Sequence, residues 1–219
     1  MTHSLNWGVL MYLSRIELEP NRRAVMKALA SPNIFHGAIE QSFPGPRGRR
    51  LWRVDTLGGK TCLLVLSQEE PDFGLLAARF GTAVWESRDY APLLSRIEKG
   101  GVWHFRLTAN PTVSKSGETS ERGRVLGHIT PEYQKQWLLD RAQKHGFSLS
   151  KEAFDVVQSQ WLRFRKGTDG GRPVTLLSVT YEGILTVTEP ALFKQALTDG
   201  LGRGKAYGLG LLTVAGRRA

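Results

Sequence analysis

The sequence predicts an α+β protein made of two β-α-β-β-α-β units in tandem. Two observations indicate this class. Strand-like and helix-like segments follow one another in the same order twice along the 219 residues. In each unit, glycine residues between two strand-like runs mark a hairpin turn. This order is that of the ferredoxin-like or RRM-like fold, so we expect two such domains, related by element order and not by sequence.

The first ferredoxin-like domain is expected over residues 11–90, after an N-terminal extension of residues 1–10. Pro20-Asn21 opens its first helix, and Pro44-Gly45-Pro46 ends the helical stretch that follows. Leu57-Gly58-Gly59 is the turn of its hairpin. Its strands are expected over residues 12–19, 51–55, 61–67 and 82–86, and its helices over residues 21–30, 33–43 and 73–80.

The second ferredoxin-like domain is expected over residues 101–219, after a linker over residues 91–100. Pro131 occupies the first position of a helix whose N-cap is Thr130. Thr188-Glu189-Pro190 starts a later helix, which ends at Gly200. The strands of this domain are expected over residues 102–107, 154–165, 173–187 and 208–215, and its helices over residues 131–144 and 188–199.

The composition points to a globular cytoplasmic protein. The only cysteine, Cys62, lies in an apolar run and is expected to be buried, so neither a disulfide framework nor a zinc site is predicted. No apolar run approaches the roughly 20 residues that cross a bilayer, so no membrane association is expected.

Thirty Lys and Arg residues against twenty Asp and Glu give a net charge of +10. The alternatives are a solvated basic surface and a surface that binds a polyanion. The cations are clustered, which favours nucleic-acid binding. The clusters are Arg47, Arg49, Arg50 and Arg53; Lys115, Arg122 and Arg124; Arg163, Arg165, Lys166 and Arg172; and Arg203 and Lys205.

Residues 200–210 hold five glycines between a predicted helix and a predicted strand. Glycine allows positive φ and close approach to a ligand, and successive backbone N–H groups in such a turn bind anions. We therefore expect Gly202, Gly204, Arg203 and Lys205 to contact a phosphate. The loop follows a helix and lacks the Gly-Lys-Ser/Thr ending of a Walker loop, which argues against nucleotide hydrolysis.

His36 is the candidate proton carrier. At helical spacing Phe35, Ile39 and Phe43 form a buried stripe, and His36 falls at its edge, on the side of Glu40. Partial burial suits a titrating group. The alternative is an ordinary histidine at a helix edge.

The sequence offers no Asp/Glu set for Mg²⁺ and no G-x-S-x-G elbow. We therefore expect neither a metal nor a cofactor. RNA carries its own nucleophile, the 2′-OH, and a histidine can act as base or acid in its attack on the adjacent phosphate. Backbone N–H groups and a cation would stabilise the charge that develops. This chemistry requires His36 and the 200–210 loop to meet in space.

Arg163 and Arg165 share one face of a predicted strand by its period of two. With Lys166 and Arg172 they surround a hairpin turn, where basic side chains can enter a groove or contact phosphates. The alternative is a solvated hairpin tip.

Several segments, in their order and spacing, resemble the CasE family of CRISPR RNA-processing endoribonucleases, the nuclease subunit of the Cascade complex. The resemblance runs from Met11 to about Ala215. It is carried by residues 11–16, by His36 followed by Phe43-Pro44, and by residues 51–54, 105–111, 182–187 and 200–212.

The resemblance implies two tandem ferredoxin-like domains and metal-independent cleavage at the 3′ base of a repeat hairpin, leaving a 2′,3′-cyclic phosphate or 3′-phosphate end. His36 matches the catalytic histidine of the family. Three residues before it, where family members have a tyrosine, this chain has Asn33, which can orient a phosphate or hydroxyl but cannot exchange a proton. Ser31, Lys27 or Lys205 could supply the second role.

The family's RNA contacts map onto two regions of this chain. The hairpin of its second domain contacts the RNA stem and corresponds here to residues 163–172. The loop after Pro111 is basic in the family, as Lys115, Arg122 and Arg124 are here. The implied partners are a CRISPR repeat hairpin and other Cascade subunits, with a monomer expected in isolation.

Three functions remain open from the sequence. The first is a CRISPR-repeat endoribonuclease. The second is a non-catalytic RNA-binding protein of the same fold, in which His36 is structural. The third is an architectural subunit of a ribonucleoprotein complex.

Overall fold

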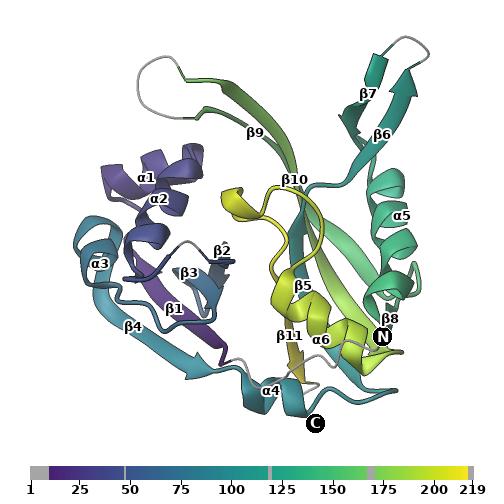
Figure 1. The fold of residues 1–219 in the computed structure, drawn as a ribbon, viewed down its shortest axis with the longest axis horizontal. Coiled ribbons are helices and arrows are strands. Elements are labelled where there is room, and N and C mark those ends of the chain that lie inside the picture. Colours follow the sequence, from purple (N-terminus) through teal and green to yellow (C-terminus); the bar gives the residue numbers. More distant parts are fainter. Residues whose placement is uncertain (1–9, 47, 118–119, 167–170, 217–219) are drawn as a thin grey trace.

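A computed structural model of the chain describes residues 10–46, 48–117, 120–166 and 171–216, and it shows two antiparallel sheets side by side with helices around them (Figure 1). Apart from Leu10, the expected N-terminal extension lies outside the described residues, as does most of the turn expected at residues 167–171.

The first sheet has the strand order β2-β3-β1-β4, which is the ferredoxin-like order. Helices cover one of its faces, and Phe35, Phe80, Ile16 and Val65 form the core between them. The elements are β1 (Tyr12–Leu18), α1 (Arg23–Ala30), α2 (Asn33–Gln41), β2 (Leu51–Leu57), β3 (Lys60–Ser67), α3 (Gly74–Phe80) and β4 (Gly81–Asp89).

The second sheet has the order β11-β5-β10-β8, with β9 paired to β10. It packs against two helices, through Phe105, Trp137, Phe193 and Leu197 among others. The elements are β5 (Val102–Ala109), α5 (Pro131–Ala142), β8 (Phe147–Ser148), β9 (Phe154–Arg165), β10 (Pro173–Val187), α6 (Pro190–Asp199) and β11 (Leu212–Gly216). The predicted fold class, two tandem ferredoxin-like domains, is confirmed.

The structure adds the two-residue strand β8, which was not expected, and differs from the expected elements at four further places. A short helix, α4 (Ala91–Ser95), lies in the expected linker, where the Asp89 carboxylate accepts a hydrogen bond from the Ala91 N–H at 2.9 Å. The basic loop after Pro111 is a hairpin of β6 (Thr112–Gly117) and β7 (Ser120–Gly127). Thr130 holds the N-cap position of α5 but makes no side-chain cap hydrogen bond. The last strand begins at Leu212, because Gly208 and Gly210 have φ of +78° and +96° and cannot continue a strand.

The two sheets share a hydrophobic core. Leu51, Leu64 and Leu66 of the first sheet join Leu107 and Leu212 of the second in one buried cluster. Because this cluster is continuous, the two domains hold each other in a fixed arrangement. Any site built from both domains therefore rests on a packed interface.

Two β-hairpin arms project toward the same side of the molecule (Figure 1). One is the outer part of β9 and β10, which lies next to α1. The other is β6 and β7, which rises above α5. The glycine-rich segment that follows α6 lies between the first domain and these arms (Figure 1).

Candidate active site

Helix α2 carries two of the predicted site residues, Asn33 and His36. Phe35 and Ile39 on its inner face are buried, at 1% and 0% exposure, while His36 is half-buried, so its predicted edge position is confirmed. Asn33 is the first residue of the helix, and the Ser31 hydroxyl donates a hydrogen bond to its side-chain oxygen at 2.7 Å. This bond fixes the Asn33 amide with its NH₂ group left as a donor.

The loop over residues 200–210 is closed on itself by backbone hydrogen bonds. The Leu201 N–H donates to the Gly210 carbonyl at 2.9 Å, and the Gly210 N–H donates to the Thr108 carbonyl of β5 at 2.6 Å. All five glycines have positive φ, between +72° and +96°. A Cβ on Gly208 would lie 2.7 Å from the Trp52 ring, and one on Gly210 would lie 2.7 Å from the Leu201 carbonyl oxygen. Packing against the protein therefore explains at least two of these glycines, in addition to any role at a ligand.

A short 3₁₀ turn, η2 (Lys205–Tyr207), forms the outer part of this loop. The turn packs against α2, the helix that carries His36, and against β2. Glycines in the left-handed conformation, Gly204 and Gly208, bound it on both sides. The helix that carries His36 and the glycine-rich loop therefore contact each other, as the sequence predicts.

Lys205 is half-buried in a cationic neighbourhood. Burial, and then the nearby Arg49, lower the pKa of its ammonium group, and Asp199 acts in the opposite direction. The pKa of His145 is lowered by burial, and then by Arg141 and Lys205. The region around Lys205 therefore carries excess positive charge, which an incoming phosphate would relieve.

Tyr207 links the turn to the β9 arm. Its ring packs edge-on against Phe164 of β9, with ring centroids 5.0 Å apart. Phe164 is 8% exposed, whereas its strand neighbours Arg163 and Arg165 are exposed. One aromatic contact therefore joins the loop with Lys205 to the strand with the predicted RNA-binding arginines.

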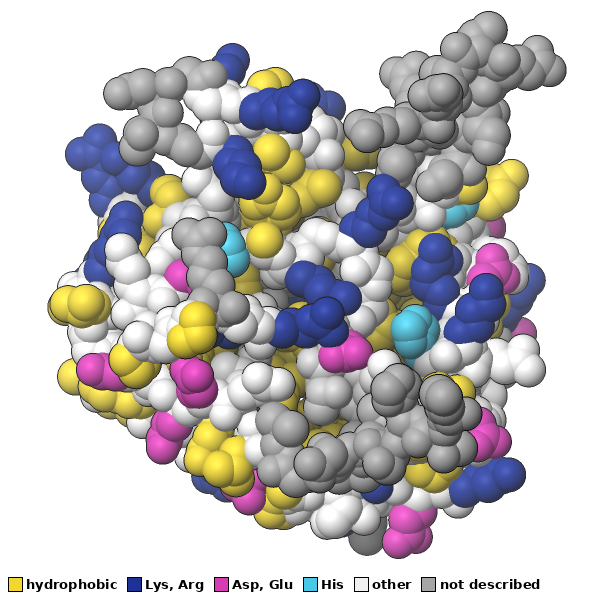
Figure 2. All heavy atoms as spheres, in the orientation of Figure 1, with side chains coloured by type: hydrophobic (Ala, Val, Ile, Leu, Met, Phe, Trp, Pro, Cys, Tyr) yellow, Lys and Arg dark blue, Asp and Glu magenta, His cyan; other side chains and the backbone are white. Residues whose placement is uncertain are grey.

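The predicted nucleic-acid contacts lie on the two arms and the loop. Arg163, Arg165, Lys166 and Arg172 are exposed on the β9–β10 arm, where the Lys166 N–H donates to the Arg172 carbonyl at 3.0 Å. Arg203 is exposed, and its backbone pairs with that of Asn110 in an isolated antiparallel β-bridge. Figure 2 shows Lys and Arg side chains gathered over the upper part and centre of this face, with most Asp and Glu side chains toward the rim.

Lys115, Arg122 and Arg124 lie on the β6–β7 arm, where Lys115 and Arg124 occupy paired positions. The structure therefore separates the predicted cations into two arms and a central loop. His36, Asn33 and Lys205 lie on two elements that pack together, below the β9–β10 arm.

Two members of the arginine cluster before and within β2, Arg50 and Arg53, were wrongly grouped with these surface cations, whereas Arg49 is exposed. The Arg50 guanidinium pairs with Glu40 at 2.6 Å, and its side chain is 5% exposed. The Arg53 side chain is 3% exposed; it donates to Asp55 at 2.7 Å and to the Leu211 carbonyl at 2.8 Å. Burial lowers the pKa of Arg53, and Asp55 opposes that effect. Both arginines hold protein groups together. Arg47 lies outside the described residues.

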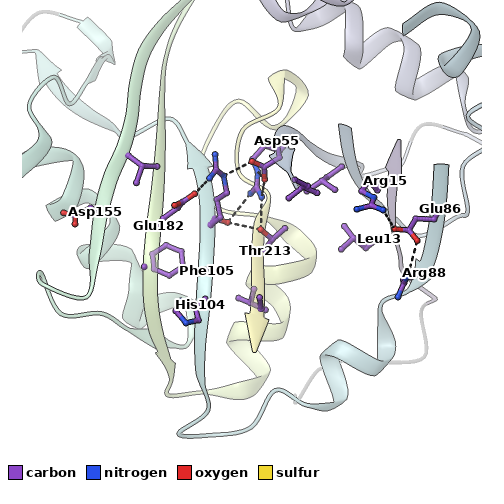
Figure 3. A pocket seen from close by; sticks show the side chains of 18 residues that line it. Leu13, Arg15, Asp55, Glu86, Arg88, His104, Phe105, Asp155, Glu182 and Thr213 are labelled. Atoms are coloured by element: carbon purple, nitrogen blue, oxygen red, sulfur yellow. Dashed lines mark hydrogen bonds and ion pairs between the residues drawn. The ribbon is translucent and has the colours of Figure 1, made fainter. Parts of the chain in front are cut away.

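Arg53 and Arg106 separate two cavities. The larger one, of about 720 Å³, lies between the two sheets and is the pocket of Figure 3, where Asp55, Thr213 and Glu182 surround the arginine network. The smaller one, of about 120 Å³, is lined by Pro32, Phe35 and Tyr207 among others, so it adjoins the candidate site. The larger cavity includes none of the predicted site residues.

Sequence reasoning missed this network, the Phe164–Tyr207 contact and the exposed Trp161. The Arg53–Asp55 pair could have been found, because residues two apart in a strand share a face. Its partners at Leu211 and Arg106 carried no sequence signal. Within the described ranges, no three His, Cys, Asp or Glu side chains are grouped as metal ligands would be. None of the helices there is long and apolar enough to cross a membrane.

A protein-family model described as "CRISPR associated protein" matches residues 11–216. The chain belongs to this family. The CRISPR-associated chain is also 31% identical, over 218 residues, to the CRISPR-associated endoribonuclease Cse3 of Thermus thermophilus, and the match covers 94% of this chain and 100% of the relative.

Solved structures agree with this assignment. A structure of the CRISPR endoribonuclease Cse3 bound to a 19-nucleotide RNA matches the CRISPR-associated chain with a TM-score of 0.77 and 30% identity, over 94% of this chain and 99% of the other. Thermus thermophilus Cse3 bound to an RNA representing a pre-cleavage complex matches with a TM-score of 0.78 and 28% identity, over the same shares. Cas6e of Escherichia coli K-12, at 22% identity and a TM-score of 0.56, shares the fold.

Proposed function

We propose that this chain is a metal-independent endoribonuclease that cleaves CRISPR repeat RNA at the 3′ base of its hairpin and so produces mature guide RNA. The observation that carries the proposal is the packing of α2, with His36, against η2, with Lys205, beneath the β9–β10 arm and its exposed cations. The 31% identity to an endoribonuclease of the same family, over its whole length, supports the same reaction.

The reaction is an attack of a ribose 2′-OH on the adjacent phosphorus. A bond forms between O2′ and phosphorus, the bond from phosphorus to O5′ breaks, and a 2′,3′-cyclic phosphate results. The 2′-OH loses its proton as the first bond forms, and the departing O5′ gains a proton as the second bond breaks. His36 makes one of these two transfers, because an imidazole gains or loses a proton near neutral pH, and Ser31, Lys27 or Lys205 makes the other. Lys205 places positive charge beside the phosphorane, and the Asn33 amide orients a phosphate oxygen.

The remaining predicted residues hold the RNA. Arginine and lysine side chains on the two arms neutralise phosphates of the stem, and the Gly202–Gly204 backbone lies against the strand to be cut. We assign these contacts to Arg163, Arg165, Lys166, Arg172, Arg203, Gly202, Gly204, Lys115, Arg122 and Arg124.

We assign residues 11–90 to a first domain, which carries the histidine. Residues 101–219 form a second domain, which carries the RNA-binding arm and the loop. We further propose that the protein acts in the cytoplasm, as a monomer when alone and with other Cascade subunits when assembled. Relatives of the same fold occur in CRISPR RNA-guided surveillance complexes.

A single-turnover cleavage assay in EDTA tests the reaction. We expect a labelled repeat hairpin to be cut once, with a cyclic-phosphate end, and a 2′-deoxy nucleotide at the cut position to block cleavage. His36→Ala should abolish cleavage and retain binding. His104→Ala, at an exposed histidine of the larger cavity, is the matched control and should cleave normally.

Two results would reject the proposal. Tight binding without cleavage by the wild-type protein would indicate the non-catalytic RNA-binding function. Weak binding that does not depend on the stem would indicate the architectural function. Cleavage that requires added Mg²⁺ would reject the metal-independent mechanism alone.

A further inference from the structure

The smaller cavity, of about 120 Å³, lies beside the elements that carry the candidate active-site residues. Pro32, which precedes Asn33, forms part of its wall, and so does Tyr207, two residues after Lys205. One water needs only about 10–15 Å³, whereas a site for a drug-sized molecule has about 300–1,000 Å³. The cavity therefore lies between these limits, as a subsite for a single nucleobase would.

One wall of the cavity is polar, and the strand register shows how this wall is built. Gln160 of β9 pairs with Ser178 of β10, and Gln158 pairs with Thr180. Thr180 in turn pairs with Thr108 of β5, and their two hydroxyls lie 3.0 Å apart. Residues directly opposite each other on neighbouring strands share a face of the sheet, and all five of these residues line the cavity. They form a row of polar groups across three strands.

This polar row lies on the face of β9 that meets the first domain and the glycine-rich loop. Phe164, on β9, contacts the Tyr207 ring of that loop. Gln160 and Gln158 lie four and six residues before Phe164, so the alternation of the strand places them on the same side. The two glutamines therefore face α1 and η2, opposite to the face of β9 that lies toward α5.

The wall on the side of the first domain is apolar and includes Leu29, Phe35 and Trp52. The bottom of the cavity is buried, since Phe35, Trp52 and Thr180 are 1%, 3% and 3% exposed, while the two glutamines at its rim are exposed. A nucleobase suits such a space, because its faces pack against apolar groups and its edges carry hydrogen-bond donors and acceptors.

The amides of Gln158 and Gln160 are available for an edge of this kind. Within the described part of the chain, neither side chain forms a hydrogen bond with another protein group. Gln134 shows the opposite case, because its Nε2 donates to the His128 and Ile129 carbonyls at 2.9 and 3.1 Å. An amide offers two donors and one acceptor oxygen, so two adjacent glutamines can read a base edge.

The position of the cavity identifies which base enters it. Cleavage at the 3′ base of the hairpin leaves the nucleotide on the 5′ side of the cut within the stem, whereas the nucleotide on the 3′ side is unpaired. Proteins read RNA sequence mainly from unpaired bases, which are free to turn into a pocket. The cavity lies next to α2 and η2, so such a base stays beside the phosphate at His36.

We propose that the cavity between α1, η2 and the β9–β10 sheet binds the base of the nucleotide on the 3′ side of the cut, with Gln158 and Gln160 reading its edge. This inference rests on the proposed function and adds a specificity subsite to it. The bound base fixes the leaving O5′ at the active site, because that oxygen belongs to the same nucleotide.

An abasic RNA tests the inference with the wild-type protein. The repeat hairpin carries an abasic ribose at the position on the 3′ side of the cut, so every reacting atom is retained and only the base is lost. We expect the single-turnover rate at sub-saturating enzyme to fall about 5- to 150-fold, the usual range for one set of base-specific hydrogen bonds. Cleavage of the abasic RNA at the unmodified rate would overturn the inference.

A double-mutant cycle shows whether the base and the glutamines act together. Gln158→Leu/Gln160→Leu keeps the size of both side chains and removes their donors and acceptors. We expect this variant to cut the unmodified RNA about as slowly as the wild type cuts the abasic RNA, with little further loss when both changes are combined. Gln68→Leu, at an exposed glutamine after β3, is the matched control and should cut both RNAs as the wild type does.

The cleaved hairpin, which lacks the nucleotide on the 3′ side, provides the second readout. Its affinity should be the same for the wild type and the double variant. Additive losses in the cycle, or weaker binding of the cleaved hairpin by the variant, would indicate a general structural effect and overturn the inference. If the wild type cuts unmodified repeat RNA through His36, only the inference fails; if it cuts neither RNA, the proposed function fails with it.

Discussion

Two arginine-rich stretches look alike in the sequence and behave differently in the structure. Arg50 and Arg53, at the start of β2, have side chains that are 5% and 3% exposed and paired with carboxylates. Arg163 and Arg165, near the end of β9, are exposed. The first pair holds the protein together, and the second is available to a polyanion.

The difference arises from what surrounds each stretch. Asp55 lies two residues after Arg53 on the same face of β2, and that face packs against the second domain, where the carbonyls of Arg106 and Leu211 accept from the guanidinium. The outer part of β9 extends beyond the sheet and meets no carboxylate partner among the described ion pairs. A cluster of cations therefore predicts a polyanion-binding site only where the strand that carries it extends beyond the packed interface between the two domains.

The largest expected effect is on Arg53. Arg53→Met leaves Asp55 buried with only Arg106 beside it, 2.9 Å away, so we expect the free energy of unfolding to fall by about 3 kcal/mol, the low end for breaking a buried pair. Urea unfolding measures it. Arg163→Met is the control and should change stability by less than about 0.5 kcal/mol. Equal losses in the two variants would contradict the comparison.

Lys205 lies between the two classes, because it is a cation that is only half-buried. Lys205→Ala should slow single-turnover cleavage by about 10²- to 10³-fold, as does the loss of one group that stabilises a developing oxyanion. RNA affinity should change far less, because the charge that Lys205 faces grows in the transition state. Parallel measurements of rate and dissociation constant check this, and equal losses in both would refute the role.

Several elements of the fold and the edge position of His36 could be predicted from the sequence, because they depend on residues close together in the chain. Pro32 and Pro44 lie on either side of α2 in the sequence, and the Phe35–Ile39 stripe placed His36 at a helix edge. The β6–β7 hairpin was missed because Ser114-Lys115-Ser116-Gly117 shows no apolar alternation. Local patterns thus identified the elements and the edge position of the histidine.

Partners distant in the chain could not be predicted. Arg53 and the Leu211 carbonyl are 158 residues apart in the chain. A residue without a Cβ is required at Gly208 because the Trp52 ring packs against it. The positive φ of the loop glycines is a local property, whereas what lies against them depends on the docking of two domains. Long-range packing therefore determines which charged side chains are buried in the protein and which remain exposed.

Arg163 and Arg165, the exposed arginines of β9, should contribute to the salt dependence of RNA binding. Arg163→Ala and Arg165→Ala each remove one phosphate neutralisation, so the slope of log affinity against log salt should become shallower by about 1 per variant. Titrations of repeat RNA across a salt series measure this slope. Arg49→Ala, whose side chain is 56% exposed but pairs with Asp199, is the control for a surface arginine with a protein partner. An unchanged slope would exclude Arg163 and Arg165 as contacts.

The pH dependence should distinguish Lys205 from a solvated lysine. Because burial and Arg49 lower its pKa, Lys205 loses its proton at a lower pH than an ordinary lysine, and cleavage that needs the charge should decline as pH rises through that value. Over the same range the unfolded chain binds more protons, so the Lys205 contribution to stability increases with pH. Lys205→Arg keeps the charge and should move the alkaline decline of the cleavage rate to higher pH. A profile identical to wild type would remove Lys205 from the reaction.

The smallest effect concerns how the exposed arginine stretch is connected to the site. No described ion pair joins Arg163 or Arg165 to the loop; the ring contact of Phe164 with Tyr207 does so instead. Such a pair contributes about 0.5–1.5 kcal/mol, so Tyr207→Leu should lower the cleavage rate about 2- to 12-fold with little change in RNA affinity. Tyr207→Phe keeps the ring and should cleave at the wild-type rate. Tyr133→Leu, at an exposed tyrosine of α5, controls for the loss of a surface ring. A Tyr207→Phe rate as low as that of Tyr207→Leu would show that the hydroxyl, and not the packing of the ring on the arm, matters for cleavage.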